Sequence, residues 1–267
     1  MQLTTFLLNK WLVEKIEAHQ YNNFLSELSI VEAAKIRSSS VSKASSWLNV
    51  VPNKSLGFLL NNSEFGTLIR STLNLEPVIQ EDLCLYCQVN HFSPDHPIEC
   101  KKGGDFQSRH NAICQVIYDL CSSALHPIKE KKGILPDLSK PADVFIPNWI
   151  NGKALCIDVS IASVTCKTVV FNSSKSTLYA ANLRNGNKVS KYGKHLNHLN
   201  ISFLPFILET SGAMTVESAK FLKRICSLIV KRSNIPYYQI SRNASQKISF
   251  LLQKHLASSF LKRSSLL

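Results

Sequence analysis

The chain has 267 residues, of which 45% are hydrophobic and 18% charged, and its mean hydropathy is −0.01. This composition excludes an intrinsically disordered chain, and the length allows one large domain or two small ones. The 31 basic residues outnumber the 18 acidic residues, which leaves a net charge of +13. Because the basic residues are spread along the whole chain, they indicate nucleic acid rather than a membrane surface as the partner. The alternative is a soluble protein whose surface is basic without a polyanionic partner.

The sequence shows no segment that would direct the chain to a membrane or to secretion. The apolar start, Phe6 to Leu8, is interrupted by Asn9 and Lys10, and no uninterrupted run of about 18 apolar residues follows. We therefore expect an intracellular protein. In that setting the eight cysteines are expected to be metal ligands or buried side chains rather than disulfides.

Helical patterns dominate the first part of the chain. Apolar residues recur at helical spacing from residue 1 to about 36, a serine-rich break follows Arg37, and a second helix is expected from Glu64 to Asn74. We interpret residues 1–80 as a helical N-terminal segment and linker.

Residues 81–104 carry four potential metal ligands in a short span. Their spacing is C-x2-C-x8-H-x3-C, formed by Cys84, Cys87, His96 and Cys100. Thiolate and imidazole groups at such intervals close tetrahedrally around Zn²⁺, so we predict a CCHC zinc site. His91 is an alternative to His96 as the third ligand. The competing interpretation is a set of ordinary buried cysteines beside a surface histidine.

A helix is predicted after Gly103-Gly104, because two consecutive glycines end the preceding segment and mark a boundary between elements. The helix runs from about Asp105 to Leu125, and its expected buried positions are Phe106, Ile113, Ile117 and Leu120. Arg109 and His110 are placed on its first turn, where backbone N–H groups and a guanidinium would meet a phosphate together. The alternative is that Arg109 pairs with an acidic neighbour.

The next stretch predicts a β-hairpin. Asn151-Gly152 lies between two segments rich in Val, Ile, Phe and Trp, and this dipeptide favours a two-residue turn because both residues tolerate positive φ. Counting outward from the turn, Ile150 faces Lys153 and Asp143 faces Ser160. One face of the hairpin is then apolar, formed by Val144, Ile146, Ile157 and Val159.

The other face of the predicted hairpin brings two carboxylates together. Asp143 and Asp158 are diagonal neighbours on this register, with Cβ atoms about 7–8 Å apart or less, so both carboxylates reach one divalent cation. Pro147 cannot donate to the strand ladder. A bulge at Pro147 that shifts the register by one residue would separate the two aspartates.

A helix from about Asn182 to Leu199 is expected to present cations to these carboxylates. Its apolar stripe is formed by Val189, Tyr192, Leu196 and Leu199. Lys188, Lys191 and His195 line up beside the stripe at i, i+3 and i+7.

The remaining elements follow from the same patterns. A strand is expected at Ile201 to Leu208, followed by two helices with basic faces at residues 215–232 and 241–262. Glu209, at the end of the strand, is either a further metal ligand or a solvated side chain.

Taken together, these motifs resemble the C-terminal region of non-LTR retrotransposon reverse transcriptase polyproteins. In that family a CCHC zinc knuckle precedes a restriction-like endonuclease domain of the PD-(D/E)XK superfamily. The resemblance covers roughly residues 44–262 and rests on the order and spacing of motifs. The residues and short motifs that carry the resemblance are Pro-Ala-Asp143, Asp158, Lys188-Val-Ser-Lys191-Tyr192, Lys-Gly-Gly104 and Arg109-His110-Asn. The chain departs from the pattern at Ala142, Ser160 and Ala213.

The resemblance implies an α/β fold with a PD-(D/E)XK core over residues 105–267, in which helices flank a central mixed sheet. It implies that Asp143 and Asp158 bind Mg²⁺ or Mn²⁺ and that Lys188 or Lys191 supplies the catalytic lysine. It also implies that Tyr192 positions a lysine or a phosphate.

The predicted function is therefore that of a metal-dependent DNA endonuclease, which hydrolyses phosphodiesters and nicks target DNA in the nucleus. The expected partners are DNA, the RNA of the retroelement and a reverse transcriptase domain in the parent element; no membrane partner is expected. Two alternatives stay open: a zinc-stabilised basic module that binds nucleic acid without cutting it, and an inactive remnant of a retroelement. The carboxylate pair with its lysines distinguishes the nuclease, because a binding module has no need of them.

Overall fold

The computed structural model describes residues 2–75, 83–88, 95–135 and 140–263. The helices are α1 (Gln2–Ser26), α2 (Ile30–Ser39), α3 (Asn62–Thr72), α4 (His96–Glu99), α5 (Asp105–Ser122), α6 (Val170–Ser173), α7 (Tyr179–Lys188), α8 (Lys194–His198), α9 (Val216–Val230) and α10 (Tyr237–Leu261). The strands are β1 (Ile128–Lys129), β2 (Val144–Ile150), β3 (Lys153–Ala162) and β4 (Ile201–Glu209). A 3-10 turn, η1 (Ser46–Asn49), and a π-helical segment, η2 (Val189–Gly193), complete the elements.

The strands form one mixed sheet in the order β1-β2-β3-β4. The pairs β1/β2 and β2/β3 are antiparallel, whereas β3 and β4 run parallel. Because parallel neighbours need a long crossover, the whole segment α6–α8 lies between β3 and β4 in the chain. The predicted mixed α/β fold class is confirmed.

The hairpin between β2 and β3 turns where the sequence predicts. Asn151 and Gly152 have φ values of +53° and +74°, as a two-residue turn of this kind requires, and Ile150 pairs with Lys153. Beyond the turn the register differs from the simple count, because the pairing shifts between Ile146 and Ile150 and Val144 then pairs with Ile157.

The shift amounts to two residues, not the single residue considered for a bulge at Pro147. Three residues of β2, 147–149, stand against Ala154 alone between the pairs Ile146–Leu155 and Ile150–Lys153. A shift of two preserves the side-chain alternation, so each residue keeps its face of the sheet. The position opposite Asp143 is therefore Asp158 rather than Ser160.

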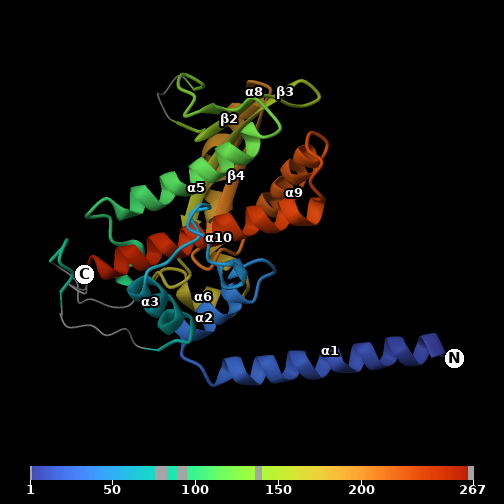
Figure 1. The fold of residues 1–267 in the computed structure, drawn as a ribbon, viewed down its shortest axis with the longest axis vertical. Coiled ribbons are helices and arrows are strands. Elements are labelled where there is room, and N and C mark those ends of the chain that lie inside the picture. Colours follow the sequence, from blue (N-terminus) through green and yellow to red (C-terminus); the bar gives the residue numbers. More distant parts are fainter. Residues whose placement is uncertain (1, 76–82, 89–94, 136–139, 264–267) are drawn as a thin grey trace.

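Helices cover both faces of the sheet (Figure 1). On one face the predicted apolar residues of the hairpin are buried in the main core, together with side chains of α5, α9 and α10: Val144, Ile146, Ile157, Val159, Ile113, Ile117, Phe221, Ile225 and Ile248. On the other face Cys156 packs with Tyr192 and Leu196, and Ile207 packs with Ala180 and Ala181 of α7.

The helix predicted at residues 182–199 is interrupted in its middle. The chain is α-helical in α7, π-helical in η2 and α-helical again in α8. Because a π turn inserts an extra residue, it rotates the later side chains relative to a regular helix. Tyr192 and Leu196 are buried as predicted, but Val189 is 44% and Leu199 51% exposed, so the four-residue apolar stripe was wrong at its ends.

Helix α5 begins at Asp105, directly after Gly104, whose φ is +77°. Ile113 and Ile117 are buried as predicted, whereas Phe106 is 39% exposed. Since the helix starts at Asp105, Arg109 and His110 lie in its second turn rather than in its first, where both were predicted.

The N-terminal segment packs against the last helix. Trp47 is buried with Leu68, Phe250 and Ala257, and its backbone N–H donates to Ser249 Oγ at 3.1 Å. Helix α1 extends away from this body (Figure 1). Capping boxes open α2 and α3: Ser29 with Glu32, and Asn61 with Glu64.

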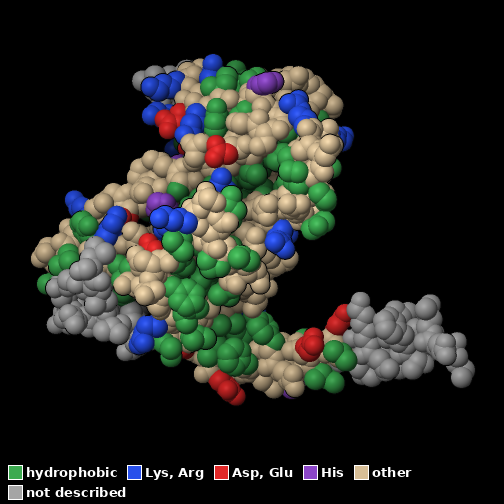
Figure 2. All heavy atoms as spheres, viewed as in Figure 1, with side chains coloured by type: hydrophobic (Ala, Val, Ile, Leu, Met, Phe, Trp, Pro, Cys, Tyr) green, Lys and Arg blue, Asp and Glu red, His purple; other side chains and the backbone are tan. Residues whose placement is uncertain are grey.

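Of the helices in the described parts of the chain, none combines the length and the apolar character needed to cross a membrane. Lys and Arg side chains are scattered over the face shown in Figure 2, beside acidic and hydrophobic ones, rather than gathered in one patch.

Candidate functional site

The two predicted aspartates meet at neighbouring positions of the hairpin. The backbone N–H of Asp143 donates to Ile157 O at 2.9 Å, and Asp143 Oδ2 accepts from the backbone N–H of Val159 at 2.7 Å. Asp158 follows Ile157 on β3 and is 6% exposed. Both side chains line the same cavity. The hydrogen bonds on either side of Asp158 therefore fix the Asp143 carboxylate next to it.

The carboxylate of Asp158 is ion-paired with one of the two candidate lysines. Lys188 Nζ, at the end of α7, lies 2.9 Å from Oδ1 and 2.8 Å from Oδ2. Burial raises the pKa of Asp158 above its usual value, the hydrogen bond and the charge of Lys188 act against this rise, and the charge of Asp143 adds to it. Lys188 thus offsets one of two neighbouring negative charges in a largely buried place.

The other residues of the predicted lysine motif lie elsewhere. Lys191 Nζ lies 4.7 Å from the ring centroid of Tyr192, and the ring of Tyr192 packs edge-on against Phe203 at 5.7 Å. Tyr192 is 8% exposed and belongs to the core between η2 and the sheet. His195 is exposed. The π turn after Lys188 accounts for this separation, because it breaks the predicted alignment at i, i+3 and i+7.

His110 of α5 contacts the second carboxylate. Its Nε2 lies 3.4 Å from Asp143 Oδ2 and 3.1 Å from the carbonyl oxygen of Val159. Both neighbours are acceptors, so Nε2 carries a proton. The hydrogen bond to Asp143, with a further contact to Cys114, raises the pKa of His110 to about 11 against the opposing effect of burial. His110 therefore stands beside Asp143 as an imidazolium cation.

These groups surround a cavity of about 270 Å³. Its charged lining is formed by Arg109, His110, Asp143, Asp158, Arg184 and Lys188. Four cations thus face two carboxylates in one concave site. Such a site attracts an anion while it keeps two oxygen ligands for a metal ion.

Arg109 is built into the wall of this cavity. It is 2% exposed, its NH2 group donates to Ile98 O at 2.9 Å, and its guanidinium carbon lies 5.6 Å from the ring centroid of Phe106. Within the described parts of the chain, its buried Nε and NH1 atoms have no hydrogen-bond partner. Burial and the charge of Arg263 lower the pKa of Arg109 to about 10, so the guanidinium still carries its charge at neutral pH.

Glu209 does not lie at this site. It is 1% exposed, and its carboxylate accepts from Ser38 Oγ at 2.6 Å and from the backbone N–H of Ala181 at 3.3 Å. Neither expectation for Glu209 holds, since it is not solvated and it does not line the aspartate cavity. It instead joins α2 and α7 to the end of β4.

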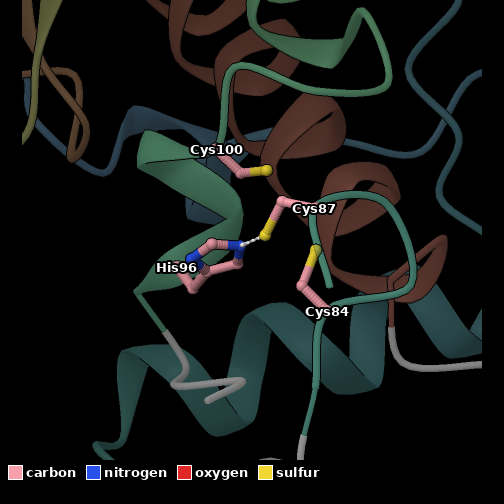
Figure 3. A group of neighbouring side chains, drawn as sticks. All are labelled: Cys84, Cys87, His96 and Cys100. Carbon is pink, nitrogen blue, oxygen red and sulfur yellow. Dashed lines mark hydrogen bonds between the residues drawn. The ribbon is translucent and has the colours of Figure 1, made fainter. Parts of the chain in front are cut away.

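The predicted zinc ligands converge at a second place. The thiols of Cys84, Cys87 and Cys100 and the ring of His96 point toward one another, and Cys87 Sγ lies 3.4 Å from His96 Nε2 (Figure 3). The four ligand atoms all lie within 4.8 Å of one another. Ligand atoms held tetrahedrally at about 2.0–2.3 Å from one Zn²⁺ lie about 3.3–3.8 Å apart, and these four atoms lie near enough to one another that the cluster could hold such a metal ion. His91, the alternative ligand, lies outside the described residues.

The cysteine cluster is anchored to the rest of the fold by Arg263. This residue is fully buried; its NH1 group donates to Asp105 Oδ2 at 2.5 Å and its NH2 group to Lys102 O at 2.7 Å. Its guanidinium carbon also lies 4.9 Å from the ring centroid of Tyr86. Cys84 and Cys100 pack against Phe260 of α10. The cluster, the start of α5 and the end of α10 therefore form one packed unit.

The other cysteines were predicted to be core residues. Cys114, Cys121, Cys156 and Cys226 are buried and Cys166 is partly exposed. All eight cysteines lie in the described residues, and none of them forms a disulfide. A second group of possible metal ligands is formed by His110, Cys114 and Asp143, whose ligand atoms also lie within 4.8 Å of one another.

Sequence reasoning missed two features of the site. Arg184 lines the cavity and stands four residues before Lys188, so helical spacing alone would have placed both on one side of α7. The contact of His110 with Asp143 joins residues 33 positions apart, and no local pattern indicates it.

No protein-family model matches this chain. No curated protein matches it either. The candidate site therefore rests on the geometry of its own residues.

Proposed function

We propose that the chain is a metal-dependent DNA endonuclease, with its active site at Asp143, Asp158 and Lys188. The observation that carries this proposal is the meeting of two carboxylates and a lysine in one cavity whose other charged residues are cationic. A protein that merely binds nucleic acid gains nothing from two adjacent carboxylates, because they repel the phosphate backbone. A nuclease gains a metal site from them.

Asp143 and Asp158 would hold the divalent cation, and Mg²⁺ or Mn²⁺ suits their oxygen ligands. The residues fit such an ion because Asp158 is nearly buried and its pKa is raised by burial and, in part, by the charge of Asp143. A positive charge between the two carboxylates would offset both the cost of burying Asp158 and its repulsion by Asp143. When bound, the ion supplies Lewis acidity and a more acidic water molecule for phosphodiester hydrolysis.

The chain's own cations have separate roles in this proposal. Lys188 would offset the charge that develops on the phosphate in the transition state, since its ammonium group already lies within 2.9 Å of Asp158. His110 would orient Asp143 through the hydrogen bond at its Nε2. Arg184, exposed on α7, would attract the DNA backbone.

The cluster of Cys84, Cys87, His96 and Cys100 would bind Zn²⁺ as a structural ion. Four protein ligands would fill the coordination of such an ion and would leave no position for a substrate. Through Arg263 and Phe260 the ion would stabilise the junction of α5 and α10, on which Arg109 and His110 depend.

The family proposal rests on the motifs of the sequence together with this arrangement. We infer a PD-(D/E)XK core of non-LTR retrotransposon origin, acting on DNA in the nucleus beside a reverse transcriptase and the RNA of the parent element. The mixed sheet between helical layers, with Asp143 directly before β2 and Asp158 on β3, supports this proposal.

A nicking assay on supercoiled plasmid with Mg²⁺ or Mn²⁺ tests the activity. Wild-type protein is expected to nick, and Asp158→Asn is expected to abolish nicking while the protein remains folded. The alternative is a DNA-binding module, which is favoured by the ion pairs that both carboxylates already make with His110 and Lys188. A folded wild-type protein that shifts DNA on a gel without nicking it would establish that alternative.

A further inference from the structure

A second cavity adjoins the aspartate cavity. It has a volume of about 530 Å³ and lies between the cysteine cluster, the start of α5, the loop after β3 and helix α7. The two cavities share four lining residues: Phe106, Arg109, Ile161 and Arg184. A ligand at the carboxylates therefore lies next to the second cavity.

The lining shared by the two cavities includes a buried cation, Arg109, some of whose hydrogen-bond donors have no acceptor among the described residues. Arg109 is 2% exposed, and within the described residues its Nε and NH1 atoms make no hydrogen bond. A buried guanidinium with unpaired N–H groups is costly unless a ligand pairs with them. Because Arg109 lines both cavities, a phosphate or a base at their junction would supply that partner.

The remaining lining suits a nucleotide. Lys101 and Arg184 add positive charge and outnumber the one carboxylate of the lining, Glu99, which accepts from Ser163 Oγ at 3.3 Å. Thr168 and Asn187 add groups that can hydrogen-bond to a base or a sugar. The ring of Phe106 is 39% exposed at the shared wall, which leaves room for a stacked base. The volume falls in the usual range of about 300–1,000 Å³ for small-ligand sites.

We propose that this second cavity binds one unpaired nucleotide of the DNA strand, adjacent to the phosphodiester that lies at Asp143 and Asp158. The proposal rests on the proposed nuclease function and deepens it, because it identifies DNA with a single-stranded segment as the preferred substrate. A base in a continuous duplex reaches such a cavity only by leaving the stack, which costs a few kcal/mol. A nucleotide that is already unpaired avoids this cost.

Binding of fluorescent oligonucleotides tests the proposal independently of cleavage. The probes are a continuous duplex and the same duplex with a short single-stranded gap, at one salt concentration and with Ca²⁺ in place of Mg²⁺. The test variants are Phe106→Ala and Arg184→Ala, whose side chains are exposed, so that folding is preserved. The matched controls are Phe65→Ala and Arg242→Ala, exposed residues that line neither cavity.

The wild-type protein is expected to bind the gapped probe at least about tenfold more tightly than the duplex, as one avoided base extrusion implies. Phe106→Ala should weaken binding of the gapped probe by about five- to 150-fold, the effect of one lost stack. Arg184→Ala should also reduce the preference, and both controls should retain it.

Equal affinity for the two probes, or a preference that survives in both test variants, would overturn the proposal. A protein that cleaves DNA without this preference keeps the nuclease function and loses the nucleotide site. A protein that shows the preference but cleaves nothing keeps the nucleotide site and loses the nuclease function.

Discussion

Lys188→Ala is expected to remove most of the DNA cleavage, whereas Lys191→Ala should leave it nearly unchanged. The two lysines stand three residues apart, yet Lys188 Nζ lies 2.9 Å from Asp158 Oδ1 and Lys191 Nζ lies over the ring of Tyr192. The comparison therefore isolates position from charge, since both variants lose one lysine.

The size of the effect follows from the environment of Lys188. Loss of one preorganised group that stabilises transition-state charge typically costs about 100- to 1,000-fold in kcat. Stability should fall as well, because Asp158 is 6% exposed and would lose its ion-pair partner. Breaking a buried pair costs about 3–5 kcal/mol. The Lys188 side chain is 25% exposed, so we expect a smaller loss, of about 1–3 kcal/mol.

Plasmid nicking rates give the effect on catalysis, and urea unfolding gives the effect on stability. In an Asp158→Asn background the stability loss from Lys188→Ala should nearly vanish, because the neutral asparagine does not become an unpaired buried charge when the lysine is removed. Equal loss of nicking in Lys188→Ala and Lys191→Ala would refute the assignment of Lys188. So would an undiminished stability cost in the Asp158→Asn background.

Three further predictions concern the surrounding structure. Burial raises the pKa of Glu209 above its usual value of 4.5. The protonated side chain therefore contributes fully to the free energy of unfolding below pH 4.5, and this contribution is lost as the pH rises through the raised pKa. The free energy of unfolding of wild type minus that of Glu209→Gln should therefore fall with increasing pH above 4.5, by at most about 1.4 kcal/mol per pH unit; a flat difference in urea titrations would contradict this. Removal of zinc by a chelator, or Cys84→Ser, should lower the Tm by about 5–10 °C, because the cluster packs on Phe260; a calorimetric scan that is insensitive to both changes would argue against a structural ion. Gly103→Ala should destabilise by about 1–2 kcal/mol or more, since φ is +82° and the new Cβ would lie 2.9 Å from the Tyr86 ring. Gly104→Ala, at a φ of +77° with open space around it, should cost less, and equal urea midpoints would refute the difference.

Much of the sheet could be predicted because its signals are local. The Asn151-Gly152 turn and the alternation along Val144, Ile146, Ile157 and Val159 follow from the backbone geometry of neighbouring residues. The position of Asp143 opposite Asp158 could not be predicted, since it depends on two extra residues in β2 near Pro147. Pattern counting shows that a proline disturbs the ladder but does not show by how many residues.

Which of the two lysines contacts the carboxylates also could not be predicted from the sequence. A regular helix places Lys188 and Lys191 side by side, and the π segment that separates them depends on how Tyr192 packs against the sheet. The burial of Arg109 likewise depends on the cysteine segment, whose Ile98 carbonyl it contacts. The four metal ligands were predictable because their spacing is short and their chemistry is specific.

A titration of the zinc-loaded protein with Mn²⁺, followed by electron paramagnetic resonance, tests most directly whether Asp143 and Asp158 together hold a divalent cation. We expect one bound Mn²⁺ per chain in the wild type. Both Asp143→Asn and Asp158→Asn should lose this ion, while Cys166→Ser should retain it. Binding of Mn²⁺ that is unchanged in the two aspartate variants would contradict the proposed metal site.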